Sequence, residues 1–302
     1  MSEAGADPTS AHPASSGREP ALAMSVDVEE YFQVQAFAGL IPRAEWDRWP
    51  SRVEASTERM LAIHDAAGAR GTFFVLGCVA EKHPGLVRRI AAAGHEIGSH
   101  GMSHTMVTEL SPAAMRAEVR DSRRLLEDLS GSPVIGYRAP SYTIGPQTRW
   151  ALDILVEAGY AYDSSIFPIR GRRYGYPDGP TLPTRLATGS ASIAEFPMTT
   201  LGAGRLRIPL LAGSYLRLLP AWISATAVRF QIARRQPLVV NIHTWEIDPG
   251  QPTVGPSRRR MWTHYARIGA TPATLARVLR IGRFASIGER LRDLGLLEAT
   301  AA

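Results

Sequence analysis

Two carboxylates close an apolar segment near the N-terminus. The sequence MSVDVEEYFQV (residues 24–34) places Asp27 and Glu29 two residues apart at the end of a predicted strand. Alternate residues of a strand point to the same face, so Asp27 and Glu29 share a face and Glu30 points to the other. Two such acids repel each other unless a cation lies between them or one holds a proton. A metal ligand beside a general base meets that condition; a solvated strand end is the alternative.

A pair of histidines is a second candidate for metal binding. In GHEIGSHGMSH (residues 94–104), His100 and His104 are four residues apart, a spacing that on a helical turn brings both imidazoles to one side. Such a spacing also arises by chance, and we expect His95 in the preceding turn to be structural. With Glu29, the pair makes a two-histidine, one-carboxylate set, which leaves coordination positions for water and substrate.

Three further predicted strands end in polar residues. Arg138, in GYRAPSYTI (residues 136–144), is permanently charged and suited to holding a carboxylate such as Asp27, although a surface arginine is the alternative. Asp163 ends the next strand, and the apolar segment 238–243 ends at His243. A lone histidine after a core strand is usually structural, but at a rim shared with the other residues it is a candidate general acid.

Strand and helix patterns alternate along the chain. Strands are predicted at 22–28, 71–76, 96–99, 134–138, 160–164, 193–198, 238–243 and 284–287, and helices at 55–67, 84–93, 112–129, 146–157, 216–234 and 271–279. Repeated β–α alternation predicts an α/β protein with a parallel sheet covered by helices, open or closed as a barrel. In parallel barrels the C-terminal ends of the strands carry the chemistry, and the polar residues described above fall at such ends.

Length and composition indicate one large domain. The chain has 302 residues, 45% of them apolar, and no domain boundary is predicted within residues 21–302. Residues 1–20, rich in Ala, Ser, Pro and Gly, are predicted to form a disordered leader. The leader lacks the apolar core of a signal peptide, and no segment has the sequence pattern of a transmembrane helix. A cytoplasmic protein is therefore predicted. The single cysteine, Cys78, is compatible with a reducing compartment.

The chain has a net charge of +6, and almost all of its positively charged residues are arginines. Two clusters, Arg170–Arg173 (interrupted by Gly171) and Arg258–Arg260, either lie in solvated loops or contact an anionic polymer or lipid surface, which leaves peripheral membrane association open. The most apolar stretch, residues 208–228, is interrupted by two prolines and an arginine, and a helix packed on the core is preferred there to a membrane contact. No nucleic-acid-binding motif is visible, so no nucleic-acid partner is expected.

Together these segments resemble the NodB-homology polysaccharide deacetylases, family 4 of the carbohydrate esterases. The resemblance runs from about residue 24 to residue 294 and rests on GTFFVLG (71–77), SHGMSH (99–104), the arginine–proline loop and the late histidine strand. SVDVEEYFQV (25–34) and residues 261–291 are most similar to a subgroup found with bacterial exopolysaccharide and exosortase loci. The resemblance implies a distorted (β/α) barrel of about seven parallel strands with outer helices and a C-terminal family-specific extension.

Carried onto this chain, the resemblance implies a divalent metal ion, zinc, bound by Glu29, His100 and His104. It assigns Asp27 as the catalytic base and Arg138 as the residue that orients it. The usual adjacent pair of aspartates is replaced here by Asp27-Val28-Glu29, so the metal carboxylate is a glutamate one residue later. Glu30 is a competitor for that role, which strand alternation disfavours.

The same resemblance assigns His243 as the general acid. The residue after the loop proline is Ser141, followed by Tyr142, which leaves open which backbone N–H lines an oxyanion hole; Ser141 is preferred. Asp163 belongs to a fourth motif that lacks the usual following tryptophan, and its pairing with His243 stays open.

The resemblance implies an activity and a class of partner. The activity is metal-dependent removal of N-acetyl groups from an amino-sugar polysaccharide or oligosaccharide, with an exopolysaccharide as substrate and its assembly proteins as partners. A small-molecule amidohydrolase of the allantoinase-like branch and a non-catalytic polysaccharide-binding protein are the alternatives. The presence of base, metal ligands and acid together favours the deacetylase.

Overall fold

A computed structural model describes residues 19–171, 175–189, 191–204, 206–255 and 261–298. Residues 1–18 of the predicted leader lie outside the described residues, as do Arg172 and Arg173 of the first arginine cluster and the whole of the second. Among the helices that these ranges contain, none combines the length and the apolar character needed to cross a membrane.

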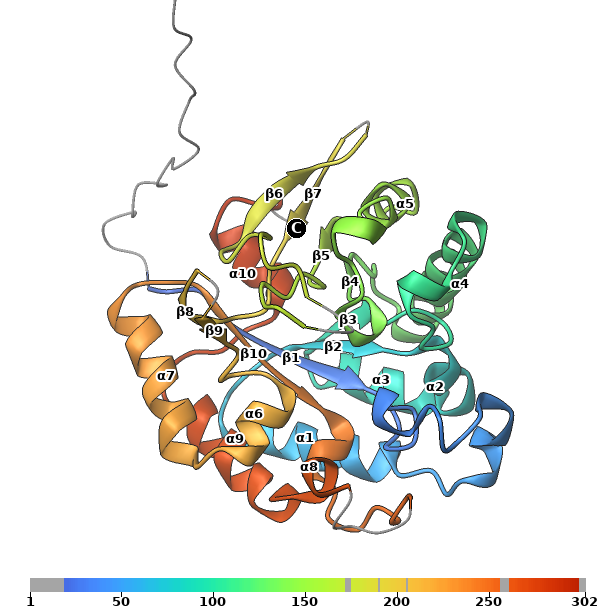
Figure 1. Cartoon of the computed structure of the whole chain (residues 1–302), viewed down its shortest axis with the longest axis horizontal. Helices are drawn as coiled ribbons and strands as arrows, with labels where there is room; N and C mark the ends of the chain where they lie inside the picture. The colour runs from blue at the N-terminus through green and yellow to red at the C-terminus, as the bar shows by residue number, and fades with distance from the viewer. Residues whose placement is uncertain (1–18, 172–174, 190, 205, 256–260, 299–302) are drawn as a thin grey trace, which may run out of the picture.

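An eight-stranded sheet forms the centre of the fold (Figure 1). Its strands are β1 (Leu22–Val28), β2 (Thr72–Val75), β3 (Glu96–Ser99), β4 (Gly136–Tyr137), β5 (Tyr162–Asp163), β6 (Thr184–Ala187), β7 (Ser192–Glu195) and β10 (Leu238–His243). Their order is β10-β1-β2-β3-β4-β5-β7-β6, and every neighbouring pair is parallel except β6 with β7. The expected α/β fold with about seven parallel strands is confirmed, as a curled sheet whose edge strands are β10 and β6.

The two longest strands lie next to each other and are covered on both faces. All seven residues of β1 (LAMSVDV) are buried, as are the first five of β10 (LVVNIH). Nearly continuous apolar runs of this kind are typical of parallel strands enclosed by helices, whereas a strand with one wet face alternates polar and apolar residues. The few polar residues within them, such as Ser25, Asp27 and Asn241, are therefore buried, and they need partners.

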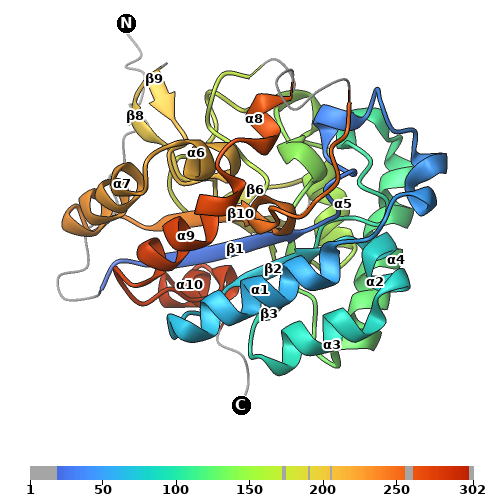
Figure 2. The ribbon, with the colours of Figure 1, turned by 90° about the horizontal axis from the view of Figure 1, so that it is seen from below.

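Helices follow the strands around the outside of the sheet (Figures 1 and 2). They are α1 (Val53–Ala66), α2 (Gly77–Lys82), α3 (Pro84–Ala92), α4 (Pro112–Ser130), α5 (Ala151–Glu157), α6 (Gly213–Leu218), α7 (Ala221–Ala233), α8 (Trp262–Tyr265), α9 (Thr271–Leu279) and α10 (Ile287–Asp293). A hairpin of β8 (Leu201–Ala203) and β9 (Leu206–Ile208) lies outside the main sheet. The edge strand β6 is not among the predicted strands.

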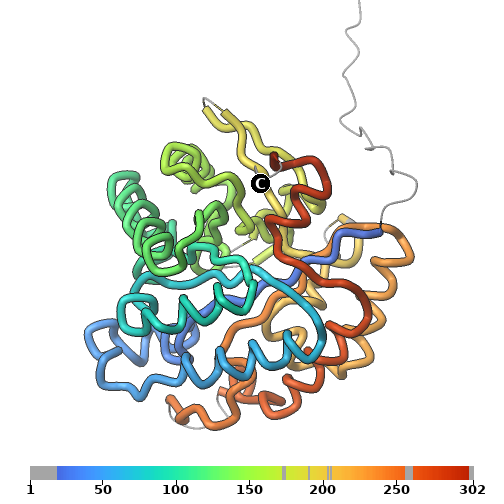
Figure 3. The backbone as a smooth tube through the Cα atoms, turned by 180° about the vertical axis from the view of Figure 1, so that it is seen from behind, coloured from blue at the N-terminus to red at the C-terminus, as the bar shows by residue number. Residues whose placement is uncertain are grey.

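Two predicted elements differ from the structure for identifiable reasons. The single helix predicted at 216–234 is two helices, because Pro220 lies between α6 and α7 and lacks the N–H that a continuous helix needs. The strand predicted at 284–287 is reduced to one bridge between Ala285 and Ala23, since Ser286 already caps α10. Figure 3 shows this C-terminal segment, in red, running beside the start of β1 in blue.

Candidate active site and metal centre

The register between β1 and β10 places two rows of polar side chains on one face of the sheet. Asp27 lies opposite His243, and Ser25 lies opposite Asn241. Since residues two apart on a strand point the same way, the four side chains gather at the C-terminal ends of both strands. The Ser25 hydroxyl donates to the Asn241 side-chain oxygen at 2.7 Å.

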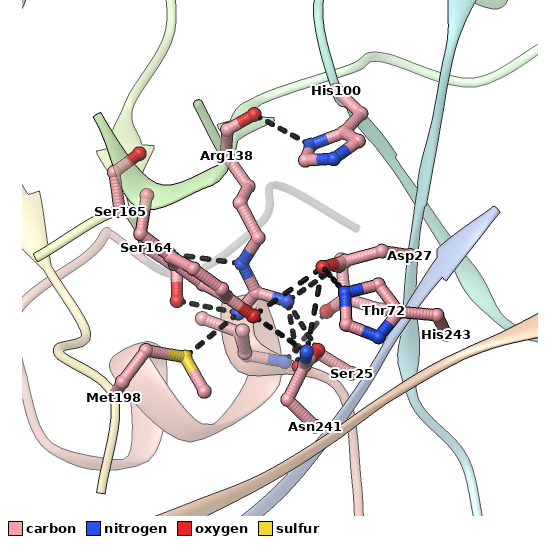
Figure 4. A network of polar contacts seen from close by, with 12 residues as sticks. Ser25, Asp27, Thr72, His100, Arg138, Ser164, Ser165, Met198, Asn241 and His243 are labelled. Atoms are coloured by element: carbon pink, nitrogen blue, oxygen red, sulfur yellow. Dashed lines mark hydrogen bonds and ion pairs between the residues drawn. The ribbon is translucent and has the colours of Figure 1, made fainter. Parts of the chain in front are cut away.

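Arg138, directly after β4, reaches this group from across the curled sheet, in which β2 and β3 separate β4 from β1 (Figure 4). Its Nη1 donates to Asp27 Oδ1 at 2.7 Å, and both side chains are buried. Burial opposes ionisation of Asp27, but Arg138 and the nearby His100 and His243 outweigh it, and the pKa of the Asp27 carboxyl is lowered. The surface-arginine alternative for Arg138 is therefore wrong.

The rest of the guanidinium is held by uncharged partners that the sequence did not single out. Nη1 also donates to Asn241 Oδ1 at 2.6 Å and to Ser25 Oγ at 2.9 Å. Nε and Nη2 donate to the carbonyl and hydroxyl of Ser164, each at 2.9 Å. Such a fully partnered guanidinium fixes the position of Asp27.

Glu29, His100 and His104 converge at the end of β1 and the start of the segment after β3. Each offers a ligand atom, these atoms lie within 4.8 Å of one another, and all three residues are buried. His104 Nε2 is 3.0 Å from a Glu29 carboxylate oxygen, and Trp245 Nε1 donates to the other oxygen at 2.9 Å. Two imidazoles and one carboxylate match the donor set of catalytic zinc sites.

The histidine pair meets by a route other than the expected helical turn. Residues 100–106 have no helix, and Gly101 and His104 adopt left-handed backbone angles (φ 79° and 58°). The helical turn predicted from the spacing of His100 and His104 is therefore wrong. A glycine accepts this conformation freely, whereas a histidine there is uncommon and held by its surroundings. The His104 carbonyl accepts from Arg43 at 2.8 Å.

Hydrogen bonding and charge put these residues in their metal-binding forms. His100 Nδ1 donates to the Arg138 carbonyl at 2.8 Å, which leaves Nε2 free to act as a ligand. Burial lowers the pKa of His100 to about 4, so the ring is neutral at pH 7. Burial disfavours the Glu29 carboxylate, but His104 and the other two histidines lower its pKa to about 2. The residues fit a divalent cation.

His243 faces the same group and is held from behind by Glu246. Its Nδ1 lies 2.9 Å from Glu246 Oε2, and its Nε2 lies 3.6 Å from Asp27 Oδ2. Although burial disfavours the imidazolium, Glu246, Glu29 and Asp27 raise the pKa of His243 to about 9. Glu246 is in turn buried in an ion pair with Arg217 of α6. In the sequence, only the position of Glu246 three residues after His243 indicates that Glu246 is the partner of His243.

Ser141 and Tyr142 form a sharp turn after Pro140, both with left-handed backbone angles (φ 54° and 55°). Tyr142 N–H donates to the Ala139 carbonyl, and proline has no N–H. The Ser141 N–H is therefore the backbone donor of this turn that can serve substrate. The Tyr142 hydroxyl, which no sequence motif indicated, accepts from Asn241 at 2.6 Å and lies 3.4 Å from Asp27 Oδ2.

Asp163 and Glu30 lie apart from this group. Asp163 accepts from the Ser165 hydroxyl at 2.6 Å and lies in register with Glu195 of β7, another buried acid. Burial raises the pKa of both carboxyls, and Asp163 raises that of Glu195 further. Glu30 accepts from the Arg52 N–H at 2.9 Å and from Ser51, on the far side of the strand end.

A pocket of about 160 Å³ opens over the converging side chains. Asp27, Glu29, His100, His104, Ser141 and His243 line it, together with Val34, Gln35, Tyr142 and Trp245. Six of the eight residues predicted for the site thus share one cavity. Arg138 lies beneath it, and Asp163 is not among the lining residues.

Comparison with known proteins supplies a family for this arrangement. Residues 45–162 match the family described as polysaccharide deacetylase. This part of the chain is thus similar to the polysaccharide deacetylases. Residues 164–292, which carry His243, Glu246 and Arg217, match a family described as a domain of unknown function, DUF3473. The deacetylase-family segment thus supplies His100, His104 and Arg138, and the second segment supplies His243.

Relatives of known name agree with this family. A peptidoglycan-N-acetylglucosamine deacetylase of Bacillus cereus is 31% identical over 131 residues, which are 42% of this chain and 46% of the relative. A peptidoglycan deacetylase of Helicobacter pylori is 30% identical over 118 residues, 37% of this chain and 38% of the relative. The match spans less than half the length of each of these relatives.

Solved structures extend the likeness in fold to nearly the whole chain. A Mycobacterium smegmatis protein assigned as a polysaccharide deacetylase has a TM-score of 0.64 at 22% identity and covers 97% of both chains. An allantoinase has a TM-score of 0.60 at 17% identity and covers 90% of this chain and 89% of its own. At 22% and 17% identity, these two likenesses establish the fold of this chain and nothing about its substrate.

Proposed function

We propose that this protein is a metal-dependent hydrolase that removes N-acetyl groups from an amino-sugar polysaccharide or oligosaccharide. The observation that carries the proposal is the meeting of Glu29, His100 and His104 within 4.8 Å of one another, in the pocket that also holds Asp27 and His243. The deacetylase-family match of residues 45–162 supports the same reaction class.

A divalent cation, zinc in this proposal, would be held by Glu29, His100 and His104, and it would polarise the acetyl carbonyl and lower the pKa of a water molecule. Two neutral imidazoles and one carboxylate leave such an ion with a net positive charge. Burial of all three side chains keeps bulk water from weakening that charge.

Asp27 is proposed to take the proton from the attacking water. Arg138 holds Oδ1, so Oδ2 is the oxygen left to act, and it lies towards the Tyr142 hydroxyl and His243 Nε2. A general base works only if its position is fixed within hydrogen-bond reach of the proton. The buried contacts of Arg138 provide that rigidity.

His243 is proposed to donate a proton to the departing sugar nitrogen, because an unprotonated amide nitrogen leaves poorly. Glu246 on Nδ1 directs the Nε2–H into the pocket. The Ser141 N–H is proposed to stabilise the negative charge on the carbonyl oxygen as water adds. The products are acetate and a free amino sugar.

Acetate release tests this proposal directly. The full chain, loaded with zinc, should release acetate from an N-acetylglucosamine oligomer, and Asp27→Asn should lower the rate by several powers of ten. Allantoin serves as the comparison substrate for the amidohydrolase alternative. Hydrolysis of allantoin without acetate release would show that the protein is an amidohydrolase of small molecules. Binding of the oligomer without turnover would show that it is a non-catalytic binding protein. Either result would contradict the proposed reaction.

The natural polymer is proposed to be an exopolysaccharide, with its assembly proteins as partners. The basis is the resemblance of residues 25–34 and 261–291 to the subgroup found with exopolysaccharide and exosortase loci. We further propose one domain from residue 21 to residue 302, with a C-terminal family-specific extension. Mass spectrometry of the polymer made with and without this protein should show acetyl groups retained in its absence.

A further inference from the structure

The outward face of α7 carries large apolar side chains where a surface helix ordinarily carries polar ones. The residues that α7 buries are small or of medium size, namely Ser224, Ala225, Ala227, Val228 and Gln231. Its two aromatic side chains are exposed instead, Trp222 to 62% and Phe230 to 49%. Helices that are apolar on all sides are normally enclosed. The packing on the core predicted for residues 208–228 is confirmed for Leu216, Ala227 and Val228, whereas Trp222 lies outside it.

The neighbouring hairpin and helix carry further exposed large hydrophobic residues. Leu206 and Ile208 of β9 are 83% and 49% exposed, and Tyr215 of α6 is 44% exposed. Figures 1 and 2 both show the β8–β9 hairpin beside α6 and α7. Of the nine exposed large hydrophobic residues in the described part of the chain, these three and the two on α7 make up five. We call these five residues the apolar patch: Leu206, Ile208, Tyr215, Trp222 and Phe230.

The charge of this segment has a single sign. Between Glu195 and Glu246 the sequence contains six arginines and no aspartate or glutamate. Arg229 of α7 and Arg234, directly after α7, are exposed, and the Arg234 guanidinium lies 5.4 Å from the Phe230 ring centroid. Exposed aromatic rings interleaved with arginines are typical of helices that lie in the interface of an anionic membrane.

A second copy of the chain fits this surface less well. In a two-fold dimer the same patch faces itself, so the arginines of one copy would meet those of the other. The segment has no acid to compensate them. Lipid phosphates would supply the missing negative charge, and the acyl region would receive the rings.

We propose that the apolar patch, with Arg229 and Arg234, docks the protein on the surface of an anionic lipid bilayer. Trp222, Phe230 and Leu206 enter the boundary between headgroups and acyl chains, and the two guanidinium groups bind headgroup phosphates. The proposal concerns a surface outside the catalytic pocket and does not depend on the proposed reaction. It differs from the earlier alternative, which placed membrane contact at the arginine clusters of residues 170–173 and 258–260.

Vesicle flotation with the full chain tests the proposal. Vesicles of phosphatidylcholine containing one quarter phosphatidylglycerol should carry the protein, and pure phosphatidylcholine vesicles should bind it at least about tenfold less. The double variant Trp222→Ala/Phe230→Ala should bind at least about tenfold more weakly, because two exposed rings no longer enter the interface. Arg229→Gln/Arg234→Gln should lose about fivefold per arginine, and salt should weaken the unmodified protein in the same way.

Leu40→Ala provides a matched control. Leu40 is as exposed as Phe230, at 49%, but lies in the segment between β1 and α1. This variant should float like the unmodified protein, and all variants should keep their unfolding temperature. Absence of flotation, or equal flotation of the Trp222/Phe230 variant, would overturn the proposal. A dimer in sedimentation equilibrium that Trp222→Ala/Phe230→Ala dissolves would also overturn it, because a second copy would then cover the patch.

Discussion

Arg138 Nη1 lies 2.7 Å from Asp27 Oδ1, with 0% of the arginine side chain and 1% of the aspartate side chain exposed. The pair joins the end of β1 to the segment after β4, and it fixes the proposed base. A buried charge that loses its partner is costly, since water cannot replace the lost contact. The same contact therefore serves stability and the proposed chemistry.

Replacing Arg138 by methionine should lower the free energy of unfolding by about 3–5 kcal/mol, because Asp27 is left buried and uncompensated. Urea unfolding measures the change. Arg116→Met is the matched control, since Arg116 pairs with Glu157 at 2.9 Å while both side chains are 53% exposed. That variant should lose less than about 1 kcal/mol. Equal losses in the two variants would show that burial of the Arg138 pair has no energetic consequence.

Removing the His100 imidazole should abolish zinc binding together with turnover. His100→Ala removes one of three ligands, and the remaining pair of donors does not make a closed set for zinc. Equilibrium dialysis should give about one zinc ion per chain in the unmodified protein and far less in the variant. His83→Ala is the control, because His83 pairs with Glu54 at 3.1 Å outside the site. Full zinc content in His100→Ala would refute the ligand assignment.

The pH dependence of turnover should report on Glu246. A general acid must hold its proton, so activity should fall as the pH rises through the pKa of His243, which neighbouring carboxylates raise to about 9. Glu246→Gln should move this alkaline limb down by about 1–2 pH units, since a charged hydrogen bond contributes about 1.5–3 kcal/mol. A bound cation lowers the pKa of His243 equally in the unmodified protein and in Glu246→Gln. The measured quantity is therefore the difference in pH between their two alkaline limbs.

Asp248→Asn is the matched control for Glu246→Gln. Asp248 is also buried and paired with arginines, at 2.8 Å from Arg52 and 3.0 Å from Arg59, but it does not contact His243. Its variant should leave the alkaline limb in place. An unmoved limb in Glu246→Gln would show that His243 does not titrate in the observed step.

Asp163 and Glu195 should make stability, rather than turnover, depend on pH. Burial raises the pKa of the Glu195 carboxyl well above its usual value. A group of this kind supports folding below its unfolded pKa and loses that support as the pH rises towards its folded pKa. Glu195→Gln should therefore gain stability relative to the unmodified protein between pH 5 and pH 8, by about 1 kcal/mol or more. Thermal unfolding at both pH values gives the comparison, and a constant difference would argue against a raised pKa at Glu195.

Much of the fold could be predicted because strong local patterns agree with it. The predicted bounds of β1, β3 and β10 match the structure, since buried parallel strands have unbroken apolar runs. The prediction failed where one residue decided the outcome, as at Pro220, or where a cap competed with a strand, as at Ser286. The outcome of such competition depends on tertiary packing, which the local sequence does not determine.

The candidate site was predictable where charge revealed it. Acids, imidazoles and an arginine at strand ends stand out against apolar surroundings. Asn241, Ser25 and Tyr142 do not, because an uncharged polar residue within a strand gives no signal until the strand register sets it beside a charge. The shape of the histidine loop also stayed hidden, since a left-handed backbone at His104 depends on contacts from Arg43 and Glu29.

Anomalous diffraction from zinc-soaked crystals tests the central claim most directly. The account predicts one strong zinc peak within bonding distance, about 2.0–2.2 Å, of Glu29, His100 and His104. Asp27 should lie beside the ion, still bound to Arg138. A zinc peak elsewhere in the molecule, with these three side chains left without a shared ion, would contradict the account.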